Sequence, residues 1–317
     1  MVSEDMKVAV IGAGSMAREH IRVFQDLPKV DVVGIYSRTR KRCDSLAQEF
    51  GIDYVADSIE ELYERTKAKL VVIAVPELAT NAVTKAAVRL PWAILMEKPA
   101  GYDLSDAEDI AAACEGRNAP VMVGFNRRFY SSVMAIRDDL DGLPNARRFI
   151  HVQDQQSYAE ARLHNHPEPV VEKFMYANSI HLIDMIMAFG RGSVSRVNQV
   201  TPWLGSKTEI MLAHIEFDSG DSALYEGIWQ GPGPWACAVS TVERRWTMQP
   251  LEAATFQNAG ERITSTLEPS VCDLTFKPGF MEQAKAAIEH TLGAESGITT
   301  IDCSLKTMRL INRIFGV

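Results

Sequence analysis

The sequence contains few cysteines, and they form no recognisable pattern. The five cysteines, at positions 43, 114, 237, 272 and 303, are odd in number and widely separated. No C-x-x-C pair occurs, so their spacing offers neither a zinc ligand set nor a dithiol redox motif. We therefore expect small, buried, apolar thiols and no metal site.

Long apolar runs and an excess of positive charge are also missing. No apolar segment approaches the ~18 residues that a membrane helix requires, so we expect no membrane span. Residues 1–7 lack the basic and apolar regions of a signal peptide, which leads us to expect a cytoplasmic protein. The formal net charge of −8 argues against an extended nucleic-acid surface.

The 317 residues are too many for one ordinary core and suit two domains. In residues 1–125, short apolar runs alternate with amphipathic segments, a rhythm typical of a doubly wound α/β domain with a parallel sheet. The loops after such strands gather at one edge, where ligands bind. The predicted strands cover residues 8–11, 32–36, 53–56, 70–75, 93–97 and 121–125.

Residues 126–317 show longer, alternating runs that predict an α+β domain with a largely antiparallel sheet. Its predicted strands cover residues 148–155, 195–203, 210–217, 222–230 and 237–242. Helices are predicted near 179–189, 279–292 and 304–315.

A glycine-rich turn joins the first predicted strand to the first predicted helix. It reads Gly12-Ala13-Gly14-Ser15-Met16-Ala17, a G-x-G-x-x-A pattern in a strand-turn-helix context. The first glycine allows the tight turn, the second lets backbone approach a pyrophosphate, and the helix N-terminus offers N–H donors. The turn therefore predicts a dinucleotide site.

The end of the second predicted strand bears on which dinucleotide binds. A carboxylate there would accept from the ribose 2′-OH of NAD, but the sequence reads Tyr36-Ser37-Arg38. Ser37 and Arg38, helped by Arg40 or Lys41, would instead bind a 2′-phosphate. NADP is favoured, and NAD remains the alternative if these basic residues are only solvated.

The fifth predicted strand ends in Glu97-Lys98-Pro99. Pro99 fixes its own φ and favours extended geometry at Lys98, so the amine is carried on stiff backbone at the ligand-binding edge. Such an amine suits proton transfer. The tripeptide alone leaves open that Lys98 is a solvated surface lysine.

An ordered set of motifs resembles the Gfo/Idh/MocA family of oxidoreductases. Besides the glycine-rich turn and Glu97-Lys98-Pro99, the set contains Ala74-Val75-Pro76, GFNRRF at 124–129 and NSIHLID at 178–184. The resemblance implies a Rossmann domain with NAD or NADP and hydride transfer with sugars or similar polyols. It also implies a homo-oligomer, dimer or tetramer, formed through the C-terminal sheet.

Within this resemblance, Lys98 corresponds to the catalytic lysine and His181 to the histidine that faces the nicotinamide. We expect Lys98 to donate and accept the substrate proton, with His181 bonding to the same oxygen. Further cofactor contacts are implied for Ala74, Val75, Pro76, Glu97 and Arg127. Substrate contacts are expected from Asn178, Tyr158, Arg162 and Trp229.

The sequence departs from the family pattern at the position four residues before His181. The family often has an aspartate there and this chain has Ala177, while the neighbouring Asn178 offers hydrogen bonds but no proton at neutral pH. Glu77 and Thr80 likewise replace the usual Asn and His. Asp184 is expected to have a structural role.

We therefore predict an NADP-preferring dehydrogenase or reductase of a sugar, nucleotide sugar or related polyol. Ala177 motivates one alternative, a catalytically silent dinucleotide-binding sensor. A dinucleotide-dependent glycosidase, also represented in the family, is the other.

Overall fold

The computed structural model describes residues 5–317, and these form two compact units. The first contains the described part of Met1–Asn126 together with Thr275–Leu305, and the second contains Arg127–Leu274 and Lys306–Val317. The predicted change of domain at residue 125 lies one residue from the observed one. Residues 275–305, however, belong to the first unit and not to the predicted second domain.

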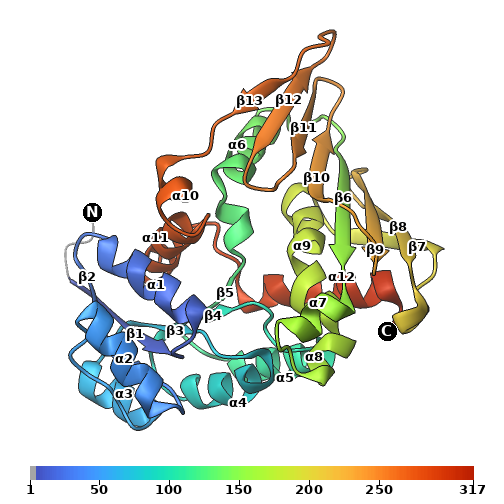
Figure 1. Ribbon diagram of the computed structural model, residues 1–317. Helices are drawn as coiled ribbons and strands as arrows, with labels where there is room; N and C mark the ends of the chain where they lie inside the picture. Colours follow the sequence, from blue (N-terminus) through green and yellow to red (C-terminus); the bar gives the residue numbers. More distant parts are fainter. Residues whose placement is uncertain (1–4) are drawn as a thin grey trace. The chain divides into compact units, whose positions relative to one another are not determined.

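The return of residues 275–305 has a packing reason. Helix α11 (Phe280–Thr291) lies against α1 (Ser15–Asp26), and both are visible side by side in Figure 1. The buried Phe280 ring lies 4.7 Å from the ring of His20 on α1. Sequence periodicity predicts such a helix but not the helix on which it packs.

The first unit is built on a five-stranded parallel sheet with the order β2-β1-β3-β4-β5. The strands are β1 (Met6–Ile11), β2 (Val30–Tyr36), β3 (Leu70–Ile73), β4 (Ala93–Glu97) and β5 (Val121–Gly124). Nearly all their central residues are buried, as expected for a sheet covered on both faces. The prediction of a doubly wound α/β domain is confirmed.

One predicted strand of this unit was wrong. Residues 53–56 form only an isolated bridge, in which Val55 pairs with Ile35 of β2. The segment lies between α2 (Arg40–Phe50) and α3 (Ile59–Thr66), and the Ser58 hydroxyl accepts from the Glu61 N–H to start α3. Because the next helix begins so soon, the segment has no room to extend into a ladder. The remaining helices are α4 (Glu77–Ala87) and α5 (Leu104–Cys114).

The second unit contains an eight-stranded sheet with the order β13-β12-β11-β10-β6-β9-β8-β7. All neighbours are antiparallel except β6 and β9, which run parallel. The five predicted strands appear as β6 (Phe149–Gln156), β7 (Val194–Thr201), β8 (Ile210–Phe217), β9 (Ser222–Trp229) and β10 (Trp235–Ser240). The last three strands at one end of this sheet, β11 (Arg244–Met248), β12 (Ala254–Asn258) and the edge strand β13 (Ser265–Leu267), were not predicted, because they are short and carry many polar residues.

Helix α9 (Ile180–Phe189) covers β6 and β10 and is almost entirely buried. A π-helical turn, Met175–Ser179, leads directly into it. The other helices of this unit are α6 (Ser131–Asp141), α7 (Tyr158–Leu163) and α8 (Glu168–Glu172), with short 3-10 turns at Asn126–Phe129 and Gly205–Lys207. Helices α10 (Val271–Thr275) and α12 (Ile301–Phe315) contain residues of both units.

Two expectations from composition can be compared with the described residues. Cys43, Cys114 and Cys237 are buried as expected, whereas Cys272 is half-buried and Cys303 is exposed. Among residues 5–317, no helix is both long and apolar enough to cross a membrane.

Candidate functional site

The turn after β1 has the shape that an anion-binding loop requires. Gly12 has φ +126°, and a Cβ on it would lie 2.0 Å from the carbonyl oxygen of Ala74, so only glycine fits. A Cβ on Gly14 would meet no atom within 4 Å, so the loop presents bare backbone to open space. The residues therefore fit a dinucleotide pyrophosphate approaching over Gly14.

Helix α1 completes this loop. It begins at Ser15 with no side-chain cap and no acidic residue in its first turn, while Ala17 is fully buried against the unit. The first-turn N–H groups and the positive end of the helix dipole are thus directed at the loop without competition from a carboxylate. An anion is the natural ligand of such an end.

The basic residues after β2 are not equivalent. Arg40 is bound to Asp44 at 2.9 Å and to Asp57 at 2.5 Å, whereas Arg38 and Lys41 are exposed. The Ser37 hydroxyl accepts from the Thr39 N–H at 3.4 Å. Arg40 is therefore already paired within its own unit, and the cation closest to Ser37 in the chain is Arg38.

Ala74, Val75 and Pro76 follow β3 beside the glycine-rich turn. The Ala74 N–H donates to the carbonyl of Ile11 at 2.8 Å, and its own carbonyl lies against Gly12. Pro76 precedes α4, in which the buried Thr80 donates its hydroxyl to the Pro76 carbonyl at 3.4 Å. The structure thus brings Ala74 to the predicted phosphate loop, while Thr80 bonds to its own helix.

Lys98 follows β4 at the same edge of the sheet. It is half-buried, and the Lys98–Pro99 peptide is cis. The preceding Glu97 carboxylate lies 2.6 Å from Nε2 of His20, a side chain of α1 that is 2% exposed. Sequence reasoning missed His20, although it shares one face of α1 with the apolar Ala17 and Phe24.

The second unit contains a polar cavity of about 320 Å³. Gln156 at the end of β6, Asn178 in the π-helical turn and Trp235 at the start of β10 contribute to its wall, and Glu160 and His164 line it from the side of α7. Amide, carboxylate, imidazole and indole groups together suit a hydroxylated ligand with an apolar face.

Trp235 connects this cavity to two predicted site residues of the same unit. The buried His181 on α9 has its ring centroid 6.3 Å from that of Trp235, and the Arg127 guanidinium lies 5.0 Å from the indole centroid. The indole N–H donates to the Gln155 carbonyl at 2.8 Å, which holds the ring in place. His181, Arg127 and the cavity wall therefore meet at Trp235.

Asp184 is a structural residue in this arrangement. Arg128 donates to both of its carboxylate oxygens at 2.7 Å, and the Thr307 hydroxyl donates to one of them at 2.9 Å. Asp184 is fully buried, so these bonds satisfy a charge that would otherwise be costly.

The other predicted substrate residues lie elsewhere in the second unit. Tyr158 and Arg162 line a different cavity of about 210 Å³, next to Trp203, and Arg162 is paired with Glu168. Trp229 is 1% exposed and packs on Tyr158, Trp203 and Phe315 as part of the core. Of the four predicted residues, only Asn178 lines the cavity beside His181 and Trp235.

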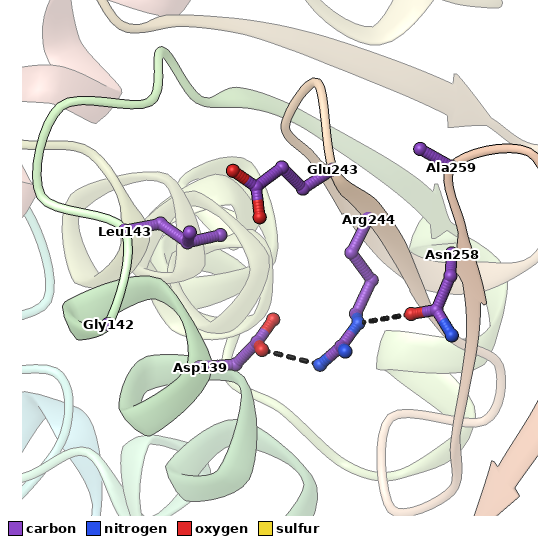
Figure 2. A pocket seen from close by; sticks show the side chains of 7 residues that line it. All are labelled: Asp139, Gly142, Leu143, Glu243, Arg244, Asn258 and Ala259. Atoms are coloured by element: carbon purple, nitrogen blue, oxygen red, sulfur yellow. Dashed lines mark hydrogen bonds and ion pairs between the residues drawn. The ribbon is translucent and has the colours of Figure 1, made fainter.

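A larger cavity, of about 520 Å³, contains none of the predicted site residues (Figure 2). Arg244 crosses it, bound to Asp139 at 2.5 Å and to Asn258 at 2.8 Å. Its charge is therefore compensated by Asp139, and the volume alone does not mark a reaction site.

Sequence reasoning also missed a buried carboxylate beneath the π-helical turn. Asp154 on β6 is 1% exposed and accepts from the Tyr225 hydroxyl at 2.8 Å and from the Gln156 amide at 2.5 Å. Burial raises the pKa of Asp154 to about 6, although its hydrogen bonds and the charge of Arg127 act in the opposite direction.

A signal for this carboxylate was present in the strand pattern. Ile150, Val152, Asp154 and Gln156 occupy every second position of β6 and lie on its buried face, so an acid stands where the period-two pattern requires a core residue.

No group of three His, Cys, Asp or Glu side chains in the described chain is placed to hold a metal ion.

Known proteins resemble the chain in sequence and in fold. Residues 6–125 match the Gfo/Idh/MocA model, described as an oxidoreductase family with an NAD-binding Rossmann fold. A D-apiose dehydrogenase of Paraburkholderia graminis is 26% identical over 210 residues, which are 63% of this chain and 53% of that relative. The matched region thus spans about half the length of this relative.

Solved structures resemble the chain over nearly its whole length. A levoglucosan dehydrogenase in complex with NADH and levoglucosan has a TM-score of 0.81 at 15% identity, covering 98% of this chain and 96% of that one. A UDP-N-acetylglucosamine 3-dehydrogenase from Acidithiobacillus ferrooxidans has a TM-score of 0.78 at 14% identity, with coverages of 98% and 96%. At these identities the likeness establishes a shared fold.

Proposed function

Because residues 6–125 match the model of the Gfo/Idh/MocA oxidoreductase family, we propose that the chain is an NADP-preferring dehydrogenase or reductase. Its substrate would be a secondary alcohol or ketone of a sugar, nucleotide sugar or related polyol. The observation that carries this proposal is the loop at Gly12 and Gly14, which admits only glycine at one position and exposes bare backbone at the other. Relatives named as dehydrogenases of sugars support the substrate class.

The first unit supplies the binding of the cofactor in this proposal. The loop and the first turn of α1 hold the pyrophosphate, and Ser37 with the exposed Arg38 binds a 2′-phosphate. A bound nicotinamide would accept or supply the hydride. No carboxylate stands at Ser37 or Arg38 to favour the free 2′-OH of NAD.

Lys98 is the proposed acid and base. Oxidation of an alcohol requires removal of the hydroxyl proton as the hydride leaves, and the neutral amine of Lys98 takes that proton at Nζ. In the reverse direction the ammonium returns it to the developing alkoxide. The Glu97 contact with His20 anchors the residue immediately before Lys98, which keeps this strand end in place.

His181, on α9 of the second unit, is the second proposed catalytic residue and would hydrogen-bond to the substrate. Trp235 supports its imidazole, and the neighbouring cavity binds the remaining hydroxyls of the substrate. Ala177 leaves no acid on the preceding turn, so Lys98 carries more of the proton transfer than a Lys-Asp-His constellation would require of it.

The test is a screen of sugars and polyols with NADP and NAD, followed at the nicotinamide absorbance band. Lys98→Ala should retain dinucleotide binding, measured by fluorescence titration, and lose at least about a hundredfold in kcat, the usual contribution of a general acid or base. Lys85→Ala is the matched control, because Lys85 is a surface lysine of the same unit that pairs with Asp109. Full activity of Lys98→Ala would overturn the role of Lys98.

Two alternatives are distinguished by the same screen. A silent sensor, which Ala177 motivates, would bind dinucleotide and show no redox change with any substrate. A dinucleotide-dependent glycosidase would release free sugar without net change in the cofactor.

A further inference from the structure

We propose that Asp154 is a positioning residue which, through Gln156, sets the orientation of the Asn178 amide and so decides whether the cavity wall accepts or donates a hydrogen bond. The inference rests on the proposed function, because it assigns substrate binding to the cavity beside His181. Asp154 itself does not line that cavity, whereas Gln156 and Asn178 do.

The three side chains form a continuous path from the sheet to the cavity. The Gln156 Nε2 donates to Asp154 at 2.5 Å, and the Asn178 Nδ2 donates to the Gln156 Oε1 at 2.9 Å. Asp154 and Gln156 project from the same face of β6, and Asn178 comes from the π-helical turn packed above it. A change at Asp154 therefore reaches the cavity through one intervening amide.

Asp154 has a second hydrogen-bond donor besides Gln156. Tyr225 on β9 donates its hydroxyl to the other carboxylate oxygen of Asp154 at 2.8 Å, and the Tyr225 ring lies over Gly227. A Cβ on Gly227 would lie 2.9 Å from that hydroxyl oxygen, so the glycine leaves room for the phenol. Burial and the neighbouring Asp154 raise the pKa of Tyr225 well above 10, so its hydroxyl stays protonated.

The ionised state of Asp154 fixes which atom donates in each of these hydrogen bonds. An ionised carboxylate only accepts, so both Tyr225 and Gln156 must donate to Asp154. Since Gln156 turns its Nε2 to Asp154, its Oε1 must accept from Nδ2 of Asn178. The Asn178 atom turned away from Gln156 is then Oδ1, an acceptor suited to a substrate hydroxyl, and Nδ2 keeps one further N–H.

Protonation of Asp154 permits the opposite arrangement. The carboxylic acid O–H can donate to Oε1 of a rotated Gln156, whose Nε2 then meets Oδ1 of Asn178. Asn178 would now offer Nδ2 to the cavity, a donor suited to a carbonyl or ether oxygen. The ionised and neutral forms of Asp154 thus give the wall opposite polarities.

The titratable and charged groups around Asp154 come from four elements. Tyr225 on β9 and Arg127 in the 3-10 turn both act to lower the pKa of Asp154. On β10 the paired residue is Trp235, and the nearby thiol is the buried Cys237. On α9 the titratable groups are His181 and Asp184, and Asp184 is already held by Arg128.

The first experiment observes the amides directly and requires neither cofactor nor turnover. The side-chain amide resonances of Gln156 and Asn178 in nitrogen-15 NMR spectra should shift together between about pH 5 and 7, because Asp154 titrates there. In Asp154→Asn this shift should disappear. Amide resonances that stay constant over this range in the wild-type protein would overturn the proposal.

The second experiment separates binding from chemistry. Asparagine at 154 offers an N–H₂ donor like the neutral acid, so Asp154→Asn should raise KM for a hydroxylated substrate about tenfold, the usual loss for one mismatched hydrogen bond. We expect kcat to change less, and the pH dependence of KM near pH 6 to vanish. A substrate analogue with that hydroxyl methylated should lose this discrimination between the two proteins.

Asp221→Asn is the matched control. Asp221 is the same residue type, equally buried in the same unit, but it is bound by Arg191 and the Arg148 N–H and does not line the cavity. An equal change of KM and its pH profile in Asp221→Asn would refute the path through Gln156. If the wild-type protein turns over no sugar or polyol, the proposed function fails, while the NMR titration still decides the role of Asp154.

Discussion

Replacement of Asp154 by asparagine should alter how the stability of the second unit depends on pH. Burial raises the pKa of Asp154 from 3.8 to about 6 in the folded chain. A carboxyl group that holds its proton more tightly when folded stabilises the fold below its unfolded pKa. That contribution is lost as the pH rises through the folded value.

The size of this effect follows from the two pKa values. They differ by about 2.2, and at about 1.4 kcal/mol for each pKa unit the wild-type chain loses about 3 kcal/mol as Asp154 ionises. About 2 kcal/mol of that loss falls between about pH 4.5 and 7.5. Because asparagine does not ionise, the free energy of unfolding of Asp154→Asn, minus that of wild type, should rise by about 2 kcal/mol over this range.

Urea unfolding followed by tryptophan fluorescence measures this difference. Four of the five tryptophans, at positions 203, 229, 235 and 246, lie in the second unit and report on it. A difference that stays flat or falls as the pH rises would show that Asp154 is ionised at its ordinary pKa, and the burial argument would fail.

Asp221→Asn is a control, because the pKa of Asp221 is shifted in the opposite direction from that of Asp154. Burial acts to raise the pKa of Asp221, but the bonds from Arg191 and from the Arg148 N–H outweigh it and leave that pKa lowered. The stabilisation from Asp221 is therefore present above about pH 4 and lost only as the pH falls further. Asp221→Asn should be less stable than wild type by a nearly constant amount between about pH 4.5 and 7.5.

Two further substitutions test the structure at other points. Gly12→Ala should abolish dinucleotide binding in a fluorescence titration, because its Cβ would lie 2.0 Å from the Ala74 carbonyl oxygen at a φ that L-residues rarely adopt; unchanged affinity would contradict this geometry. Arg128→Met should lower the free energy of unfolding by about 3 to 5 kcal/mol, since it leaves the buried Asp184 without its cation. Restoration of most of that stability in Arg128→Met with Asp184→Asn would support the charge argument, and no restoration would refute it.

The agreement between sequence and structure is best where the pattern is local. The strand β1, the turn at Gly12 and the helix α1 are adjacent in the chain, so apolar alternation and glycine spacing suffice to predict them. The segment at 53–56 has the composition of a strand but pairs only at Val55, because strand formation also requires a neighbour along its length.

The candidate site could be predicted from the sequence only in part. Lys98 lies at the predicted end of its strand and His181 on its predicted helix, whereas Trp229 lies in the core and Arg162 pairs with Glu168. The aromatic or cationic character of a residue does not reveal whether it points into a cavity. That depends on which neighbours fill the space around it.

The amino-acid sequence by itself determined the parallel α/β unit and its dinucleotide loop, because backbone geometry and hydrophobic periodicity act over a few residues. Only the tertiary structure decided that residues 275–305 return to the first unit and that Asp154 meets Tyr225, 71 positions later in the chain. The same holds for the polarity of the cavity wall. A carboxylate acquires its pKa and its partners from burial and from contacts distant in the sequence, and these exist only once the sheet has formed.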